Sequence, residues 1–266
     1  MKGPALGACS VFAKLNPPNS DAVIALAGNP NTGKSTVFNG LTGLSQHTGN
    51  WPGKTVVLAK GNYRYRNKLI TLVDLPGTYS LLANSADEQV ARDFICFGQP
   101  DATVVVVDAT CLERNLNLAL QVIEMTPKVI LCVNLIDEAK RKKIEVDYDK
   151  LAELLGVPVV PTAARDKVGL DTLKETIHQM VFAHKHPRPQ LVRYNQAIEA
   201  AVAKIQKEVE PYLKGRIDSR WVALRLLDGD TTIIAGIKEY LRNKETGETE
   251  PAEFGTNGLK VVRSHK

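Results

Sequence analysis

Residues 28–35 read G-N-P-N-T-G-K-S and match the phosphate-binding pattern G-x-x-x-x-G-K-[ST] at every fixed position. The apolar run at 22–27 is typical of a buried parallel strand, and residues 36–41 begin a helix with one apolar face. A chance glycine-rich turn is the alternative, but it would need neither flank. Strand, turn and helix together place backbone N–H groups and the positive end of a helix dipole around a polyphosphate. The pattern therefore predicts an α/β domain with a phosphate-binding edge.

Two side chains of this loop have predictable roles toward a nucleotide. The Lys34 ammonium would reach the β- and γ-phosphates, and the Ser35 hydroxyl would bind Mg²⁺. The other contacts would come from main-chain N–H groups. The residues predicted to bind the phosphates are Gly28, Asn29, Pro30, Asn31, Thr32, Gly33, Lys34, Ser35 and Thr36.

A second motif, Asp74-Leu75-Pro76-Gly77, follows the strand predicted at 69–73. D-x-x-G at the end of a strand is the second magnesium-side element of Ras-like GTPases. Asp74 would hold Mg²⁺, usually through water, and the Gly77 N–H would sense the γ-phosphate. Asp-x-Pro-Gly is also an ordinary turn sequence. Its place downstream of the phosphate loop favours the magnesium site.

The identity of the nucleotide base is predicted from Asn134-Leu135-Ile136-Asp137. This segment follows an apolar strand at 128–133 and matches the guanine-reading pattern N-x-x-D. The Asp137 carboxylate can accept hydrogen bonds from guanine N1–H and from the exocyclic amine, and adenine offers neither at those positions. Because an unpaired buried acceptor is costly, such a site can reject adenine by up to ~10⁴-fold. Leu135 stands where the common motif has lysine, so we expect weaker binding and faster nucleotide release. The alternative is that Asn134 or Asp137 only caps the next helix.

Thr162, Ala163 and Ala164 follow the strand predicted at 157–161 and would form the last base-contacting loop. Small residues let the main chain approach the base, where a backbone N–H would meet the guanine oxygen. This segment is weak evidence alone and gains weight from its order after the other motifs. The motifs in this order predict a protein that binds GTP or GDP with Mg²⁺.

The same motifs resemble the cytosolic N-terminal region of the ferrous iron transport protein B family. The resemblance rests on G-N-P-N-T-G-K-S-T, N-W-P-G-K-T-V at 50–56, D-L-P-G-T-Y-S-L at 74–81 and N-L-I-D, and residues 219–230 resemble the family's helical domain. It implies a Ras-like P-loop GTPase domain, with a mostly parallel six-stranded sheet and helices on both faces, followed by a small all-α domain. In the full protein these domains would precede a membrane-embedded iron-transport region.

Three residues receive roles through this resemblance. Thr55 would supply the switch I hydroxyl that completes the Mg²⁺ shell when GTP is bound. Thr78 stands where Ras-like enzymes that orient water carry glutamine, so unassisted hydrolysis should be slow. Asn31 is similar to the asparagine that coordinates K⁺ in cation-stimulated GTPases, unless it only supports a turn. The predicted catalytic residues are Asn31, Lys34, Thr55 and Gly77, with Ser35, Thr55 and Asp74 on Mg²⁺ and Asn31 on K⁺.

The alternation of strands and helices stops near Pro187, and apolar residues then recur every three to four positions, as in packed helices. The spacing fades again after Glu245. We therefore predict four segments: a flexible N-terminal tail at 1–20, a GTPase domain at 21–186, a helical domain at 187–245, and a flexible tail at 246–266 that leads toward the membrane region.

Composition narrows the class of protein and leaves one rival. Of the 266 residues, 44% are hydrophobic, which is enough for a core, but no apolar stretch approaches the ~20 residues that span a bilayer. The four cysteines lack C-x-x-C spacing and form no metal-binding group with the histidines, so a cytosolic compartment is expected. The net charge of +5 and the basic run at 140–143 raise the alternative of an RNA- or ribosome-associated GTPase, yet this run has no interleaved aromatic residues.

The resulting prediction is a slowly GTP-hydrolysing domain that regulates or powers ferrous iron uptake from the cytoplasmic side of the bacterial inner membrane. Its partners would be a guanine nucleotide and the transporter region of the same protein, with a homo-oligomer as a further option and no nucleic acid. A nucleotide-gated interaction module with negligible turnover is a third class.

Overall fold

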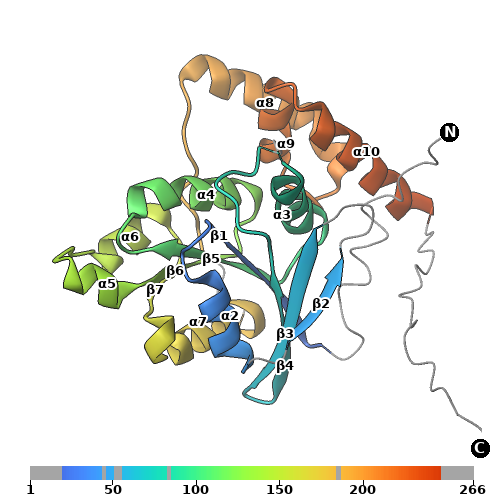
Figure 1. Ribbon diagram of the computed structural model, residues 1–266. Coiled ribbons are helices and arrows are strands. Elements are labelled where there is room, and N and C mark those ends of the chain that lie inside the picture. The colour runs from blue at the N-terminus through green and yellow to red at the C-terminus, as the bar shows by residue number, and fades with distance from the viewer. Residues whose placement is uncertain (1–19, 44–45, 51–55, 83–84, 184–186, 247–266) are drawn as a thin grey trace, which may run out of the picture.

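The computed structural model describes residues 20–43, 46–50, 56–82, 85–183 and 187–246. The Thr55 prediction lies outside the described residues, as do residues 1–19 and 247–266 of the two predicted tails. The described chain forms an α/β unit followed by three helices (Figure 1).

The sheet is mixed and has an antiparallel edge. Its strands are β1 (Ala22–Gly28), β2 (Gln46–Asn50), β3 (Val57–Tyr65), β4 (Lys68–Asp74), β5 (Ala102–Asp108), β6 (Val129–Asn134) and β7 (Val159–Pro161). In the described part of the chain seven strands follow the order β2-β3-β4-β1-β5-β6-β7. β4, β1, β5, β6 and β7 pair in parallel, whereas β3 is antiparallel to both β2 and β4.

The sheet therefore has one strand more than the six that the sequence predicts. The additional strand, β2, pairs with β3 from Gln46 opposite Gly61 to Asn50 opposite Val57. Its sequence Q-H-T-G-N lacks the alternation of apolar and polar residues from which strands are predicted. An edge strand bonds through its main chain to a single neighbour, so it can form without that pattern.

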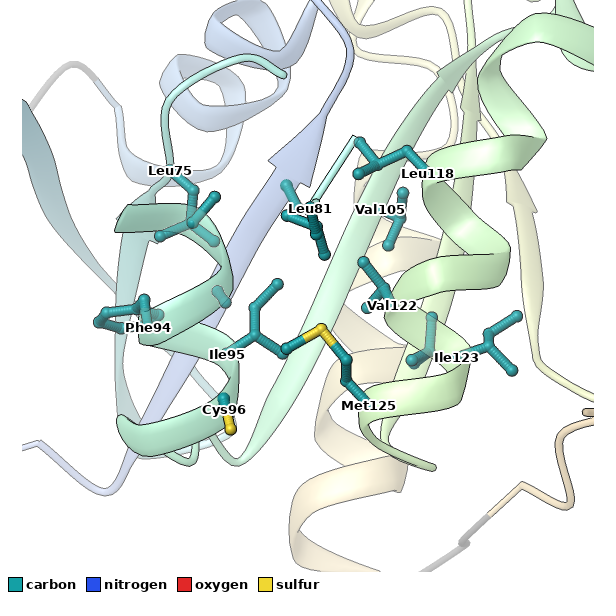
Figure 2. Close-up of a cluster of buried hydrophobic side chains, with 14 of the residues drawn as sticks. Leu75, Leu81, Phe94, Ile95, Cys96, Val105, Leu118, Val122, Ile123 and Met125 are labelled. Carbon is teal, nitrogen blue, oxygen red and sulfur yellow. The ribbon is translucent and has the colours of Figure 1, made fainter. Parts of the chain in front are cut away.

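Helices cover both faces of the sheet (Figure 1). They are α2 (Lys34–Thr42), α3 (Ala86–Phe97), α4 (Leu112–Met125), α5 (Ile136–Arg141), α6 (Tyr148–Leu155), the 3₁₀ turn η1 (Ala164–Asp166) and α7 (Leu170–Phe182). α2 and α7 pack on one face, where Phe38 and Ile177 share a core cluster. α3 and α4 pack on the other, where Phe94, Leu118 and Val122 belong to a second cluster (Figure 2).

Local sequence explains where several of these elements begin and end. Ser85, Asp147 and Asp218 each accept a hydrogen bond from the N–H three residues later and so cap a helix start. Gly156 ends α6 in the left-handed conformation that favours glycine. β1 is buried at every position, as a central strand covered on both faces must be.

The three C-terminal helices, α8 (Gln196–Leu213), α9 (Ser219–Leu227) and α10 (Thr231–Thr246), lie on the side of α3 and α4 (Figure 1). Gly236 lets α10 approach α3 closely, since a Cβ there would lie 3.1 Å from the Phe97 ring. Arg92 of α3 is 2% exposed and donates to Asp230 at 3.4 Å and to Thr232 at 3.0 Å. The helical segment is thus attached to the helix that follows the D-x-x-G motif. No helix in the described ranges is both long and apolar enough to cross a membrane.

Candidate nucleotide-binding site

The predicted motifs meet at one edge of the sheet, where the parallel strands have their carboxyl ends. Asp74 ends β4 opposite Leu26 of β1, two residues before Gly28. Asp108 ends β5 opposite Asn134, the last residue of β6. In open α/β sheets ligands bind outside the carboxyl ends of the strands. The register therefore brings the phosphate loop, D-x-x-G and N-x-x-D together.

The phosphate loop requires glycine at two positions. Gly33 has φ 76° and ψ 19°, in the left-handed region, and a Cβ there would lie 2.3 Å from Asn134 Nδ2. At Gly28 a Cβ would lie 2.6 Å from Val106 O on β5. Glycine at these two positions therefore lets the loop backbone lie directly against the ends of β5 and β6.

The other loop residues divide into buried and exposed side chains. Asn29 and Thr32 are buried, and the Thr32 hydroxyl donates to Asn29 O at 2.9 Å. Asn31, Ser35 and Thr36 are exposed. Asn31 also has a left-handed φ of 67°, which asparagine tolerates better than most residues. Of the side chains predicted to bind cations, the two in this loop, those of Ser35 and Asn31, are thus accessible.

Lys34 and Asp74 form an ion pair at this edge. The Lys34 ammonium donates to Asp74 Oδ1 and, at 2.6 Å, to Leu75 O. The two charged side chains are only 10% and 15% exposed. Burial raises the pKa of the Asp74 carboxyl above its ordinary value, and the Lys34 charge opposes this rise. A polyphosphate would compete with Asp74 for Lys34, which would free the carboxylate.

The donors at this edge fit Mg²⁺. The Ser35 hydroxyl and the Asp74 carboxylate offer hard oxygen ligands, and Mg²⁺ in nucleotide sites takes its other ligands from phosphate and water. Asn31 offers an amide oxygen to a monovalent cation. Within the described ranges no three His, Cys, Asp or Glu side chains form a group that could hold a metal ion.

The D-x-x-G turn rests on the phosphate loop. The Thr78 N–H donates to Gly28 O at 3.3 Å, and a Cβ at Gly77 would lie 3.4 Å from Pro30 Cα. The Thr78 side chain is buried, and its hydroxyl donates to Ser80 O at 2.6 Å. Thr78 therefore uses its hydroxyl within its own turn.

Asn134 connects the phosphate loop to the predicted base-contacting loop at 162–164, called the base loop below. Its Nδ2 donates to Thr32 O at 3.0 Å, and its Oδ1 accepts from Thr162 Oγ1 at 3.0 Å and from Ala164 N–H at 3.1 Å. The residue is 1% exposed. Only the second Nδ2 hydrogen is left for a nucleotide. The sequence predicts Asn134 as a nucleotide contact, and the structure adds this positioning role.

Asp137, the predicted guanine acceptor, lies in the first turn of α5 with its side chain 31% exposed. Arg141 Nη2 lies 3.7 Å from its carboxylate, one helical turn later. A cavity of about 820 Å³ is lined by Asp137, Ala163, Lys140 and Lys143, among others. The basic run at 140–143 is exposed and adjoins this end of the site. Sequence reasoning missed Arg141, although its spacing of four residues from Asp137 is a recognisable pairing signal.

The base loop uses its N–H groups within the protein. Thr162 N–H donates to Val133 O at 2.8 Å and Ala163 N–H to Val168 O at 3.1 Å. Ala164 N–H donates to the Asn134 side chain and would have to share that bond with a guanine oxygen. Burial raises the pKa of the neighbouring Cys132 thiol to about 12, so this cysteine is an apolar component of the site.

Leu135 lies beside the phosphate loop. It adopts the left-handed conformation, with φ 63°, directly before α5. Its Cδ2 would lie 3.9 Å from a Cβ at Gly33. The side chain thus packs near the loop, where a leucine supplies apolar contact but no hydrogen bond.

Comparisons with known proteins identify the family of this chain. Residues 22–177 match the family described as ferrous iron transport protein B, and residues 194–254 match the FeoB cytosolic helical domain. The Fe(2+) transporter FeoB of Salmonella choleraesuis (strain SC-B67) is 39% identical over 229 residues, which are 84% of this chain and 29% of that protein. The FeoB of Escherichia coli (strain K12) is 41% identical over 214 residues, which are 78% of this chain and 27% of that protein. The chain spans less than a third of these curated relatives.

Solved structures give the same result. The cytosolic domain of T. maritima FeoB in a GDP form is 37% identical, with a TM-score of 0.75 over 84% of this chain and 87% of that chain. The same domain in a GMPPNP form is 38% identical, with a TM-score of 0.73 over 82% and 86%. The predicted fold class, a Ras-like P-loop GTPase domain followed by a small all-α domain, is confirmed. This chain belongs to the ferrous iron transport protein B (FeoB) family.

Proposed function

We propose that this chain binds GTP and GDP with Mg²⁺, hydrolyses GTP slowly, and through this cycle regulates or powers ferrous iron uptake by a membrane transporter. The observation that carries the proposal is the convergence of Lys34, Asp74 and Asp137 at one sheet edge. The similarity to T. maritima FeoB domains in GDP and GMPPNP forms supports it.

Each part of the nucleotide has a proposed partner in this chain. Lys34 would bind the β- and γ-phosphates, Ser35 and Asp74 would hold Mg²⁺, and the Gly77 N–H would meet the γ-phosphate. Mg²⁺ bound there would neutralise phosphate charge. Asp137 would accept from guanine with its carboxylate, since the nearby Arg141 guanidinium donates to Glu138 and lies 3.7 Å from Asp137.

Slow hydrolysis follows from the groups around the attacking water. Thr78 carries no side-chain amide that could orient water, and its hydroxyl donates to Ser80 O at 2.6 Å. Asn31 is exposed beside the phosphate positions and could hold K⁺ through its amide oxygen. We therefore propose that K⁺ accelerates the reaction through Asn31.

The link to transport would run through α3. This helix follows the D-x-x-G turn and is attached to α10 by Arg92, which binds Asp230 and Thr232. The matched part of this chain is 29% of the Salmonella choleraesuis relative, and we propose that α10 transmits the signal to the remaining part of such a protein. Movement of the turn would then reach the transporter region through α3 and α10.

The first experiment is a titration of the purified chain with GDP, GMPPNP and ATP in the presence of Mg²⁺. We expect binding of the two guanine nucleotides and none of ATP at the same concentrations. A preference for ATP would overturn the proposal. A sub-micromolar GDP affinity would contradict only the weakening assigned to Leu135.

The K⁺ role is tested by measuring phosphate release in K⁺ and Na⁺ buffers with wild type and Asn31→Ala. Faster release in K⁺ should be lost in the variant while GDP affinity is kept. Equal rates in both buffers would remove the cation role.

The transport role requires the full-length protein in cells. Lys34→Ala should abolish both nucleotide binding and ferrous iron uptake at equal protein abundance. Wild-type uptake by this variant would separate the nucleotide cycle from transport.

A further inference from the structure

Asn29 is a buried polar residue whose side chain has no hydrogen-bond partner in the described structure. The residue is 2% exposed, and both Oδ1 and Nδ2 are buried and unpaired. Among the described residues with an unpaired buried side-chain atom, it alone leaves two such atoms. Buried amides are nearly always paired in native proteins, because the unpaired state is destabilising. An unpaired buried amide inside a phosphate loop is therefore a candidate for a functional role.

Asn115 shows the usual arrangement for a buried asparagine near the same sheet edge. It is 4% exposed, its Nδ2 donates to Cys111 O at 2.8 Å, and its Oδ1 accepts from Asp108 N–H at 3.4 Å. Burial near this edge therefore does not prevent an asparagine from being paired, so the state of Asn29 is specific to its place in the loop.

That place lies under the D-x-x-G turn. Gly28, on one side of Asn29, accepts from the Thr78 N–H at 3.3 Å. Pro30, on the other side, lies close to Gly77, where a Cβ would come within 3.4 Å of Pro30 Cα. The turn thus touches both neighbours of Asn29. Any shift of Gly77 and Thr78 changes the surroundings of residue 29.

We propose that Asn29 is a positioning residue whose amide becomes paired only when a γ-phosphate draws the D-x-x-G turn onto the nucleotide. The proposal rests on the proposed function, because it takes the Gly77 N–H as the γ-phosphate contact. The unpaired amide raises the free energy of the empty and GDP-bound forms relative to the triphosphate form. The Asn29 side chain therefore favours triphosphate over diphosphate without itself touching either nucleotide.

The test replaces the amide by an apolar group of nearly the same shape. In Asn29→Leu the unpaired donor and acceptor are gone, so the nucleotide-free unfolding midpoint should rise by about 2–4 °C. The affinity for GMPPNP should fall about tenfold, because one net hydrogen bond is lost, while that for GDP changes less than about twofold. Asn29→Ala provides the same affinity ratio if the leucine variant does not fold.

Asn115→Leu is the matched control. It removes a paired amide, so its nucleotide-free midpoint should fall while the ratio of GMPPNP to GDP affinity stays at the wild-type value. A lower midpoint in Asn29→Leu, or an unchanged ratio, would overturn the proposal. An equal loss of both affinities would also overturn it and would indicate a direct contact with a part that GDP and GTP share. Wild-type protein that binds neither nucleotide would instead remove the proposed function.

Discussion

The connection between α3 and α10 can be measured by removing the charge of Arg92. The side chain is 3% exposed, and its Nη1 lies 3.4 Å from Asp230 Oδ2, which belongs to a side chain that is 14% exposed. Breaking a buried ion pair by removing one partner costs about 3–5 kcal/mol. Arg92→Met also removes the ion pair with Asp93 at 2.8 Å, but both carboxylates keep some exposure and Asp230 keeps its hydrogen bonds from Thr232, so we expect about 3 kcal/mol for the two pairs together. This corresponds to a midpoint shift of roughly 6–12 °C for a chain of this size.

Asp230→Asn isolates the charge from the second role of this residue, which is to cap α10. Asparagine caps helices as well as aspartate does, so the bond from the Ile233 N–H should survive. Arg92 also keeps its pair with Asp93 at 2.8 Å, so the loss should be only about 1–2 kcal/mol.

Urea unfolding of wild type, both single variants and the double variant gives the coupling energy. We expect the double variant to lose about 1–2 kcal/mol less than the sum of the single losses, because residues in contact are not additive. The matched control is Lys150→Met, which breaks an ion pair whose side chains are 53% and 71% exposed and should cost at most about 0.5 kcal/mol. Additivity of Arg92→Met and Asp230→Asn within about 0.5 kcal/mol would refute the assigned link.

Three further changes have predictable outcomes. Asp137→Asn should lower GTP affinity by about 10²-fold and raise xanthosine triphosphate affinity, since the amide can donate to the oxygen that replaces the guanine amine; an unchanged preference in competition titrations would contradict this role. Gly33→Ala should destabilise the chain by about 1–2 kcal/mol and abolish nucleotide binding, because φ is 76° and the Cβ would lie 2.3 Å from Asn134 Nδ2; wild-type unfolding and titration curves would disprove it. Hydrogen bonds from Arg220 lower the pKa of Glu199 from 4.5 to about 2, so its stabilisation is complete above about pH 4.5 and is lost as the pH falls toward 2. Arg220→Met should remove this part of the acid dependence, and identical pH profiles of the unfolding midpoint would argue against it.

The part of the site that could be predicted from sequence is the part made by consecutive residues. The phosphate loop is recognised from eight adjacent residues, although the space that excludes a Cβ at Gly28 and Gly33 is filled by Val106 of β5 and Asn134 of β6. The central strand β1 can also be predicted from sequence, since burial on both faces requires an unbroken apolar run. The edge strand β2 carries no such pattern, so only its pairing with β3 identifies it as a strand.

The hydrogen bonds of the base loop could not be predicted in the same way. N-x-x-D spacing points to Asn134 as a nucleotide contact, but it does not reveal that Asn134 donates to Thr32 O, 102 residues away in sequence. Nor does it reveal that the Ala164 N–H is already paired. Motifs specify which groups are present at an edge, whereas the fold decides how many of those groups remain free for a ligand.

Whether a buried polar side chain is paired also decides its effect on stability, as Arg92 and Asn29 illustrate. Local rules would place an arginine on the exposed face of α3, because arginine is seldom fully buried. Its charge is paired inside the protein by two carboxylates, that of the adjacent Asp93 and that of Asp230, 138 residues later. Asn29 is buried without such a partner. Removing the paired group should therefore destabilise the empty protein, whereas removing the unpaired group should stabilise it. Asn29 lies between the two phosphate-loop residues that the D-x-x-G turn approaches, and Arg92 lies on α3, the helix that follows the turn. If Asn29→Leu raises the unfolding midpoint and Arg92→Met lowers it, then Asn29 destabilises the empty nucleotide site, whereas Arg92 stabilises the attachment of α10 to α3.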